Sequence, residues 1–473
     1  MVKYLERKEE NYLHVFAQHN ENCEKIWGQT NISDERGEFQ RDRERIVNSK
    51  AFRRMVDKAQ IFTSSKGDHY RTRMTHTMEV AQIARSIANS LRLNIDLTEA
   101  IALGHDVGHT PFGHQGERTL QDILNHKIEV GLPQVEEKNI YGGFKHNFQS
   151  VRVLNCLEEK YVAYEGLDIS YQVLEGVLKH TGYHQKECGK CGMDKCPRKC
   201  CDLKAFLGKG EMDRLFTKIE FPTTLEGQVV SIADEIAQRS HDVDDAMSAG
   251  LLDYEGLRSF LEREKMEPLL TIINKSYDEI KASKREYSSI KQMVCARVIS
   301  DIINYLINDA IQESKKRIEK FEENDFYKKE HRFSEVLVDF SETGKEICGL
   351  LEGMVKRIVI NNPEIVKFDY NANIIVKKLF ETYYHNPKLL HKGTLKKLEI
   401  EIHDELGERI DFAEGDIEEV QKQLSAISSN LDGTNLNSPE WKKHIILVRT
   451  IVDYIAGMTD SYARNEHASF CGE

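Results

Sequence analysis

Residues 75–117, THTMEVAQIARSIANSLRLNIDLTEAIALGHDVGHTPFGHQGE, decide the fold class because they combine two helical patterns with a turn rich in glycine and histidine. In the first pattern apolar side chains recur every three or four residues, as on one face of a helix. A second helix is predicted to begin near Thr98 as its N-cap and to end at Gly104. The apolar face of the first helix consists of Val80, Ile83, Ala84, Ile87 and Leu91.

The composition of the 473 residues extends this prediction to the whole chain. Only 8 prolines and 29 glycines occur, and the stretches between them are rich in Leu, Ile, Ala, Glu and Lys, which favours helix. Charged residues make up 30% and hydrophobic residues 40%, as in globular proteins with a sizeable core. We therefore expect an all-α fold.

Charge and hydropathy exclude several classes of protein. The sequence has no run of about 18 apolar residues, and its start, MVKYLERKEENYLHVF, lacks the apolar core of a signal peptide. A cytoplasmic protein without a membrane partner is therefore expected. The net charge of −12 argues against a surface that coats nucleic acid, since that needs clustered Lys and Arg. It does not exclude a local basic pocket for an anionic substrate.

The chain has no internal repeat, and its organisation is predicted from changes in composition. Thr223 and Glu226 have the spacing of a capping box before an apolar helix that carries Asp234 on its inner face. The charges that follow are expected to form solvated helix faces. The predicted parts are an N-terminal segment (1–40), a catalytic core (41–250), a helical region (251–440) and a C-terminal helix returning to the core (441–473).

Four side chains form a candidate metal site: His76, His105, Asp106 and Asp234. Two imidazole nitrogens and two carboxylate oxygens suit Mn, Mg, Fe, Zn or Co and leave positions open for other ligands. Each of these residues taken alone is more often a satisfied core or capping residue. Their order along the chain, H…HD…D, is the pattern of HD-domain phosphohydrolases.

Longer blocks of sequence make the resemblance specific. The chain closely resembles the deoxyguanosinetriphosphate triphosphohydrolase family of the HD-domain superfamily in FQRDRERIVNSKAFRRMVDKAQIF, GDHYRTRMTHTMEVAQIARSIA, ALGHDVGHTPFGHQGE, FKHNFQSVRVL, ADEIAQRSHDVDDAM and DYIAGMTDSYA. These blocks lie between about 40 and 246 and again at 453–463. The resemblance implies an HD-domain helical bundle extended by further helices. It also implies cleavage of a dNTP, dGTP by the family name, to the deoxynucleoside and tripolyphosphate.

The same resemblance implies separate roles for the residues of the site: metal binding, proton transfer and phosphate contact. The four metal-binding candidates would polarise a phosphoryl oxygen and lower the pKa of a bound water. Glu117 would orient His114, and this catalytic pair would move the proton. Implied phosphate contacts are Arg73, His109 and His146.

Two further positions resemble the sugar contacts of the family, namely Gln60 and Asp242. Asp242 lies eight residues after Asp234 and hence on nearly the same helix face. Relatives commonly have a tyrosine one turn after that aspartate, where this chain has Gln238. This departure puts the means of rejecting ribonucleotides in doubt.

A cysteine-rich insertion near 186–202, CGKCGMDKCPRKCC, departs from the family pattern. Cys188, Cys191, Cys196 and Cys200 are spaced as in a structural zinc site. An iron–sulfur or redox-sensing role and uncommitted surface cysteines are the alternatives.

Two other functions compete with dNTP hydrolysis. Another HD-domain nucleotidase or phosphodiesterase would share the metal ligands, and a catalytically silent sensor would bind nucleotide without turnover. The resemblance implies a homo-oligomer, a hexamer or tetramer, and an allosteric nucleotide or single-stranded DNA effector is a further expectation.

Overall fold

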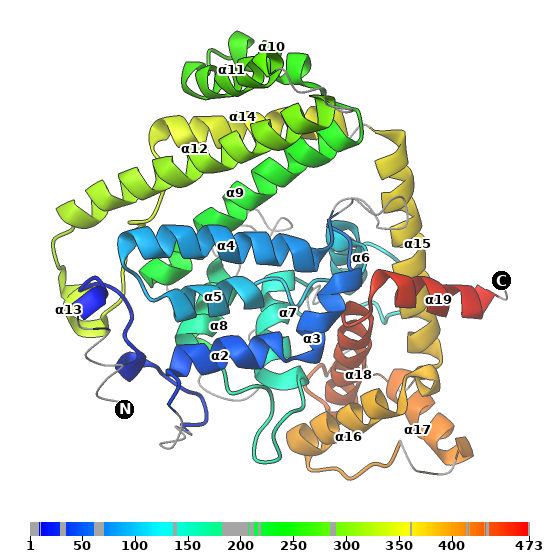
Figure 1. The fold of residues 1–473 in the computed structure, drawn as a ribbon. Helices are drawn as coiled ribbons and strands as arrows, with labels where there is room; N and C mark the ends of the chain where they lie inside the picture. The colour runs from blue at the N-terminus through cyan, green and yellow to red at the C-terminus, as the bar shows by residue number, and fades with distance from the viewer. Residues whose placement is uncertain are drawn as a thin grey trace.

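The computed structural model describes residues 9, 11–28, 35–60, 71–135, 140–181, 207, 212–215, 219–283, 290–359, 362–412, 415, 417–429, 431 and 435–471. Over these residues the regular elements are helices, and β-pairing is limited to isolated bridges. The predicted all-α fold is confirmed (Figure 1).

The longest interval between successive α-helices of the described residues separates α8 from α9. Those of the first half are α2 (Glu38–Val47), α3 (Lys50–Arg54), α4 (Arg73–Leu91), α5 (Ile95–Gly104), α6 (Gly113–Leu124), α7 (His146–Arg152), α8 (Tyr171–Lys179) and α9 (Leu225–Ser248). Those of the second half are α10 (Tyr254–Arg263), α11 (Glu267–Ala282), α12 (Ile290–Lys320), α13 (Asp325–Glu330), α14 (Glu342–Val359), α15 (Pro363–His385), α16 (Lys392–Leu406), α17 (Ile417–Ser429), α18 (Pro439–Ala456) and α19 (Asp460–Cys471).

The first hydrophobic core lies between α4, α5, α8 and α9. Helix α4 packs against α5 and α9, and α5 packs in turn against α2 and α8. Figure 1 displays α4, α5 and α2 side by side, with α9 crossing toward α12 and α14. The apolar face predicted for α4 is fully buried in this core, and it comprises Val80, Ile83, Ala84, Ile87 and Leu91.

Two predicted helix starts are wrong, the first by four residues and the second by one. The N-cap of α5 is Asn94, whose side chain accepts the N–H of Leu97, while the Thr98 hydroxyl donates to the Asn94 carbonyl. The N-cap of α9 is Thr224 rather than Thr223. Glu226 closes no capping box, because its carboxylate accepts backbone N–H groups from Gln18 and Asn94. In both places a neighbouring residue with equal capping ability takes the position.

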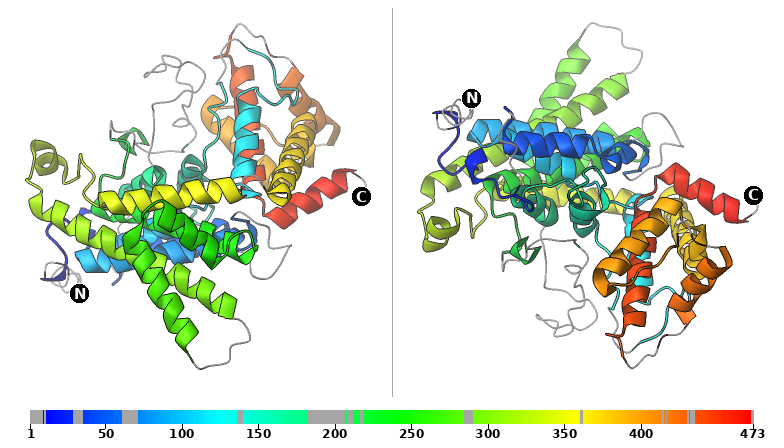
Figure 2. Two further views of the ribbon diagram at one scale, coloured as in Figure 1. Left: turned by 90° about the horizontal axis from the view of Figure 1, so that it is seen from above. Right: turned by 90° about the horizontal axis from the view of Figure 1, so that it is seen from below.

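A second hydrophobic core joins α6 to helices from the end of the chain. Phe112, Leu120, Ile123 and Leu124 pack with α15, α16, α17 and α18. Figure 2 displays α15 to α18 as a group to one side of the main body in both views. The division of the chain at 40, 250 and 440 stays a prediction.

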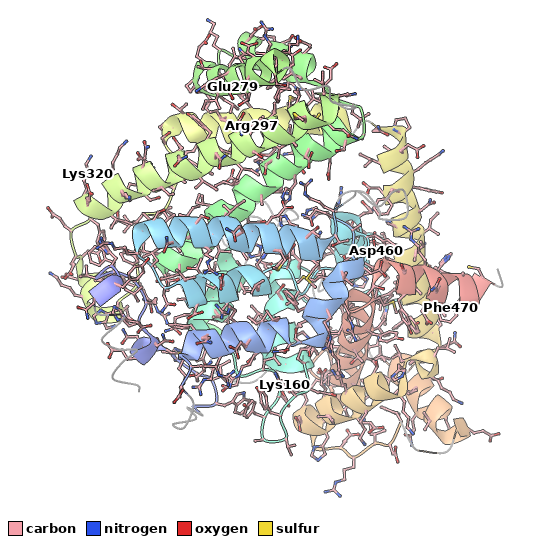
Figure 3. All side chains as sticks on the ribbon, viewed as in Figure 1. Lys160, Glu279, Arg297, Lys320, Asp460 and Phe470 are labelled. Atoms are coloured by element: carbon pink, nitrogen blue, oxygen red, sulfur yellow. The ribbon has the colours of Figure 1, made fainter. Side chains whose placement is uncertain are left out.

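The C-terminal signature DYIAGMTD connects the two cores. Asp453 on α18 accepts from Arg152 and Gln149 of α7, with distances of 2.8 Å to the arginine Nε and 2.7 Å to the amide nitrogen. Asp460 begins α19, and Figure 3 labels it where α19 meets α3, with Phe470 at the far end of the same helix. The end of the chain therefore packs against the residues that precede α4 and α6.

None of the helices in the described part of the chain is long and apolar enough to cross a membrane.

Candidate functional site

Helices α4, α5 and α9 bring the four candidate metal ligands together. His76 lies near the start of α4, His105 and Asp106 follow α5, and Asp234 lies on α9. The Oδ1 atom of Asp234 is 3.1 Å from His76 Nε2 and 3.7 Å from His105 Nε2. His105 Nε2 is also 3.5 Å from Asp106 Oδ1. Two nitrogens and two carboxylates thus face one point.

The free ring nitrogen of His105 indicates that a cation fits this point. His105 Nδ1 donates to the Ala102 carbonyl at 2.6 Å, so the neutral ring has its lone pair on Nε2. This Nε2 atom is buried and has no hydrogen-bond partner among the described residues. Buried polar atoms without partners are rare in folded proteins. A lone pair that faces two carboxylates is typical of a site for a divalent metal.

Asp106 also contacts Arg73 and His109 beside the site. Its Oδ2 atom accepts from Arg73 Nη1 at 2.7 Å, and its Oδ1 atom lies 3.0 Å from His109 Nε2. Burial alone would raise the pKa of Asp106, but His105, His109 and Arg73 hold it well below the usual value. The carboxylate is therefore charged and able to bind a metal.

Arg73 is the buried cation next to the candidate metal ligands. Its side chain is 1% exposed, and its Nε and Nη2 atoms have no hydrogen-bond partner in the described part of the chain. A buried guanidinium with unused donors incurs a desolvation penalty unless an anion binds it. Its free donors are suited to phosphate oxygens.

Glu117 on α6 is hydrogen-bonded to His146, not to His114 as expected. Glu117 Oε2 is 2.8 Å from His146 Nδ1, and Lys145 Nζ is 3.6 Å from Glu117 Oε1. Burial opposes the charge on Glu117, but His146 and His109 lower its pKa overall. Burial likewise opposes the charge on His146, and Glu117 raises its pKa overall. The contact therefore favours the charged carboxylate of Glu117 and the protonated ring of His146.

His114 lies beside this pair at the solvent side. The ring nitrogens of His109 and His114 and a Glu117 carboxylate oxygen lie within 4.8 Å of one another. Although the side chain of His114 is exposed, His109 and His146 crowd its ring. This crowding and the charge of Arg73 lower the pKa of His114 to about 4. Without a ligand His114 is neutral.

His109 and His146 stack on each other, with ring centroids 3.9 Å apart. The Nδ1 atom of His109 is buried without a partner among the described residues. Gly108 permits this arrangement, because a Cβ atom there would lie 2.1 Å from the Ser150 nitrogen on α7.

The candidate sugar contacts lie at the edge of the described site. Gln60 has a buried Oε1 without a partner among the described residues, and it precedes residues 61–70, which the structure does not describe. Asp242 lies two turns after Asp234 on α9, and burial raises its pKa to about 7. Gln238, one turn after Asp234, accepts from its neighbour Arg239 at 3.3 Å.

Sequence reasoning missed several residues around the metal ligands. His241 is in contact with His76, and Glu79 is in contact with His241. His180 packs against His105, and a ring nitrogen of each lies with an Asp234 oxygen in a group spanning at most 4.8 Å. The seven-residue spacing from Asp234 to His241 is two helical turns and could have identified His241.

Cys188, Cys191, Cys196 and Cys200 lie outside the described residues, so the predicted zinc site stays a prediction.

Comparisons with known proteins agree with the geometry. Residues 73–239 match the HD domain family, and residues 424–469 match the phosphohydrolase-associated domain. A deoxyguanosinetriphosphate triphosphohydrolase-like protein of Brucella ovis is 33% identical over 435 residues, which cover 92% of this chain and 89% of that protein. Proteins of the same description from Rhizobium johnstonii and Agrobacterium fabrum are 32% and 33% identical, covering 92% and 91% of this chain and 89% and 88% of their own length.

Proposed function

Because the chain belongs to the deoxyguanosinetriphosphate triphosphohydrolase-like family of HD-domain hydrolases, we propose that it is a metal-dependent dNTP triphosphohydrolase. Water attacks the α-phosphorus of the dNTP, and the bond from this phosphorus to the ribose O5′ breaks. The products are the deoxynucleoside and inorganic tripolyphosphate. We take dGTP as the first substrate to test, with the other dNTPs as candidates.

The single observation that carries this proposal is the pair of unused donors on Arg73. They lie on a guanidinium that already holds Asp106, so an anion bound there is next to the candidate metal ligands. A triphosphate supplies several oxygens for such donors. His146 in the neighbouring cluster, whose pKa is raised by Glu117, extends the positive surface available to it.

A divalent metal held by the site would supply a positive charge that polarises a phosphate oxygen. Mn or Mg suits the carboxylates, while Fe, Zn or Co suits the imidazoles. The helices that carry the ligands are packed in the first core, so the ligands are preorganised. The residues proposed to hold the metal are His76, His105, Asp106 and Asp234.

We assign the proton transfer to His114, assisted by Glu117. The pKa of His114 is about 4 without ligand, but the negative charge of a triphosphate next to Arg73 would raise it. His114 would then be protonated when substrate is present and could deliver its proton to the O5′ atom. Glu117, kept charged by His146, stabilises the protonated ring.

Gln60 and Asp242 are proposed to hold the sugar. Gln60 has an unused buried carbonyl oxygen that can accept from a sugar hydroxyl. The side chain of Asp242 is partly buried on the α9 face that follows Asp234.

Product analysis tests the proposal directly. Purified protein loaded with Mn or Mg is incubated with dGTP, dATP, dCTP, TTP and GTP, singly and in pairs, and the phosphate products are separated by ion exchange. Tripolyphosphate with the matching deoxynucleoside supports the proposal. Orthophosphate or pyrophosphate would indicate another HD-domain phosphohydrolase, and binding of dNTPs without products would indicate a sensor.

The same assay tests for an effector. Turnover that appears only with a second nucleotide or with single-stranded DNA would identify an allosteric activator. We expect a homo-oligomer, and light scattering would distinguish a hexamer from a tetramer.

A further inference from the structure

The two histidines of the candidate metal site differ in what contacts their second ring nitrogen. His105 Nδ1 donates to the Ala102 carbonyl, which can only accept, so the proton of His105 is fixed on Nδ1. His76 Nδ1 instead lies 3.1 Å from His241 Nδ1. An imidazole can donate or accept, so this contact alone does not decide which nitrogen of His76 carries the proton.

Which nitrogen of His241 carries the proton depends in turn on the contact of His241 with Glu79. The Nε2 atom of His241 is hydrogen-bonded to Glu79 Oε2. Arg71 Nε lies 3.5 Å from the other carboxylate oxygen, which favours the charged form of Glu79. An ionised carboxylate only accepts, so a neutral His241 carries its proton on Nε2 and has its lone pair on Nδ1.

The position of the proton on His241 determines the position of the proton on the proposed metal ligand His76. His76 Nε2 is hydrogen-bonded to Asp234 Oδ1 at 3.1 Å, and a metal ion bound between these atoms would take the place of the proton there. His76 would then keep a single proton, and because His241 Nδ1 accepts, that proton lies on His76 Nδ1. We propose that Glu79 and His241 are positioning residues that fix the tautomer of His76 and thereby set the metal affinity of the site. Outer partners of this kind orient metal-binding histidines and raise their basicity.

The fold makes the three-link chain rigid. Glu79 lies three residues after His76 on α4, so both side chains lie on one face of that helix. His241 lies on α9, the helix that also carries Asp234, and its side chain is 1% exposed. Glu79 has a side chain that is 42% exposed, so it can be replaced with little disturbance of the core.

Three substitutions at Glu79 test the proposal through metal affinity rather than activity. Glu79→Gln keeps an accepting oxygen, Glu79→Ala removes it, and Glu79→Lys replaces it with a group that only donates. A donor there forces the His241 lone pair onto Nε2 and the His76 proton onto Nε2. We expect Mn²⁺ affinity to fall by at most a few-fold for glutamine, about 10-fold for alanine and about 100-fold for lysine.

The matched control reverses the charge of a neighbouring residue that is not part of the hydrogen-bonded series Glu79, His241 and His76. Asp244 also pairs with Arg71, at 2.6 Å, and its side chain is partly exposed. Asp244→Lys should change Mn²⁺ affinity only through weak surface electrostatics. Equal losses for Glu79→Lys and Asp244→Lys would overturn the proposal, as would equal losses for all three Glu79 variants.

A double-variant cycle gives an independent test. His241→Phe breaks the link itself, so it should weaken Mn²⁺ binding about 10-fold, and Glu79→Lys should then have no further effect. Additive effects of the two substitutions, or unchanged binding in His241→Phe, would overturn the proposal. Thermal unfolding of the metal-free variants distinguishes a lost fold from a lost tautomer. The readout is metal affinity, so it stands or fails independently of the substrate proposed above.

Discussion

The metal side and the acid side of the candidate site rest on different hydrophobic cores. His76 lies on α4 and His105 directly follows α5, and the apolar faces of these two helices fill the first core. Glu117 belongs to α6, whose buried Leu120 and Leu124 fill the second core together with the last helices of the chain. Metal binding and proton transfer are therefore expected to be separable by substitution although the groups lie close together.

Buried hydrogen bonds of Asp460 link the two cores. Asp460 accepts the N–H groups of Ala59 at 3.2 Å and of Phe112 at 2.8 Å. Phe112 has a φ of +62°, an uncommon conformation for a residue with a side chain, at the residue before α6. The C-terminal signature thus positions the start of α6 relative to Ala59.

The largest effect is expected on the metal side. Asp106→Ala removes a proposed ligand and the partner of Arg73, so we expect the bound metal to be lost and turnover to fall by about 1,000-fold or more. Elemental analysis of the dialysed protein measures the first effect and tripolyphosphate release the second. A variant that keeps one metal per subunit would contradict the assignment of Asp106.

The next largest effect is expected on the acid side. His114→Ala and Glu117→Ala should retain the metal but lower turnover by about 100-fold, the usual scale for a lost acid–base group. Unchanged metal content in both variants would support the expectation that metal binding and proton transfer depend on different cores. Loss of metal in Glu117→Ala would show that metal binding and proton transfer cannot be separated by substitution. Full turnover in His114→Ala would show that His114 is not the group that transfers the proton.

A smaller effect is expected at the junction of the cores. Asp460→Ala leaves the N–H groups of Ala59 and Phe112 without their acceptor, so we expect turnover to fall by about 10-fold and stability by roughly 2–5 kcal/mol, with metal retained. Metal analysis, turnover and urea unfolding check these outcomes. Asp57→Ala is the control, because Asp57 accepts from Ser461 at the same junction but contacts neither of those groups. Similar losses in both variants would contradict a specific role of Asp460.

The sequence predicted those features that depend on local periodicity. The buried face of α4 follows from the spacing of its apolar residues, and the side chains predicted to bind a metal do meet at one point. Helix starts were less predictable, since Asn94 and Thr224 cap as well as the neighbouring residues that were expected.

Features that depend on tertiary packing could not be read from the sequence. Glu117 and His146 are 29 residues apart, and only the tertiary fold, which brings the beginning of α7 to Glu117 of α6, makes them a pair. The same holds for Glu79 and His241, which are separated by 162 residues. No local pattern indicates that α6 packs with the last third of the chain, because its apolar spacing would suit either core.

The last effect is expected at Lys58, a buried lysine between the cores, where the free energy of unfolding rather than turnover should change. Its Nζ atom donates to the carbonyls of His109 and Ala456, the latter at 2.8 Å. Burial lowers its pKa to about 7, with Arg54 and Arg73 adding to the shift and Asp460 opposing it. The unfolded chain binds a proton at this lysine up to about pH 10. Between pH 7 and 10 the unfolded state therefore holds more protons, so the free energy of unfolding should rise with pH.

Lys58→Met tests this sign, because methionine binds no proton in either state. The wild-type free energy of unfolding should rise between pH 7 and 9.5 by up to about 1.4 kcal/mol per unit, and the variant should lose that rise. Its stability should also be lower at every pH, since two carbonyls lose their donor. Urea unfolding of the metal-free proteins measures both, with Lys50→Met on the exposed side of α3 as the control. An unchanged pH slope in Lys58→Met would contradict the lowered pKa of Lys58. The lysine that links the two cores would then be charged in the folded protein over this pH range.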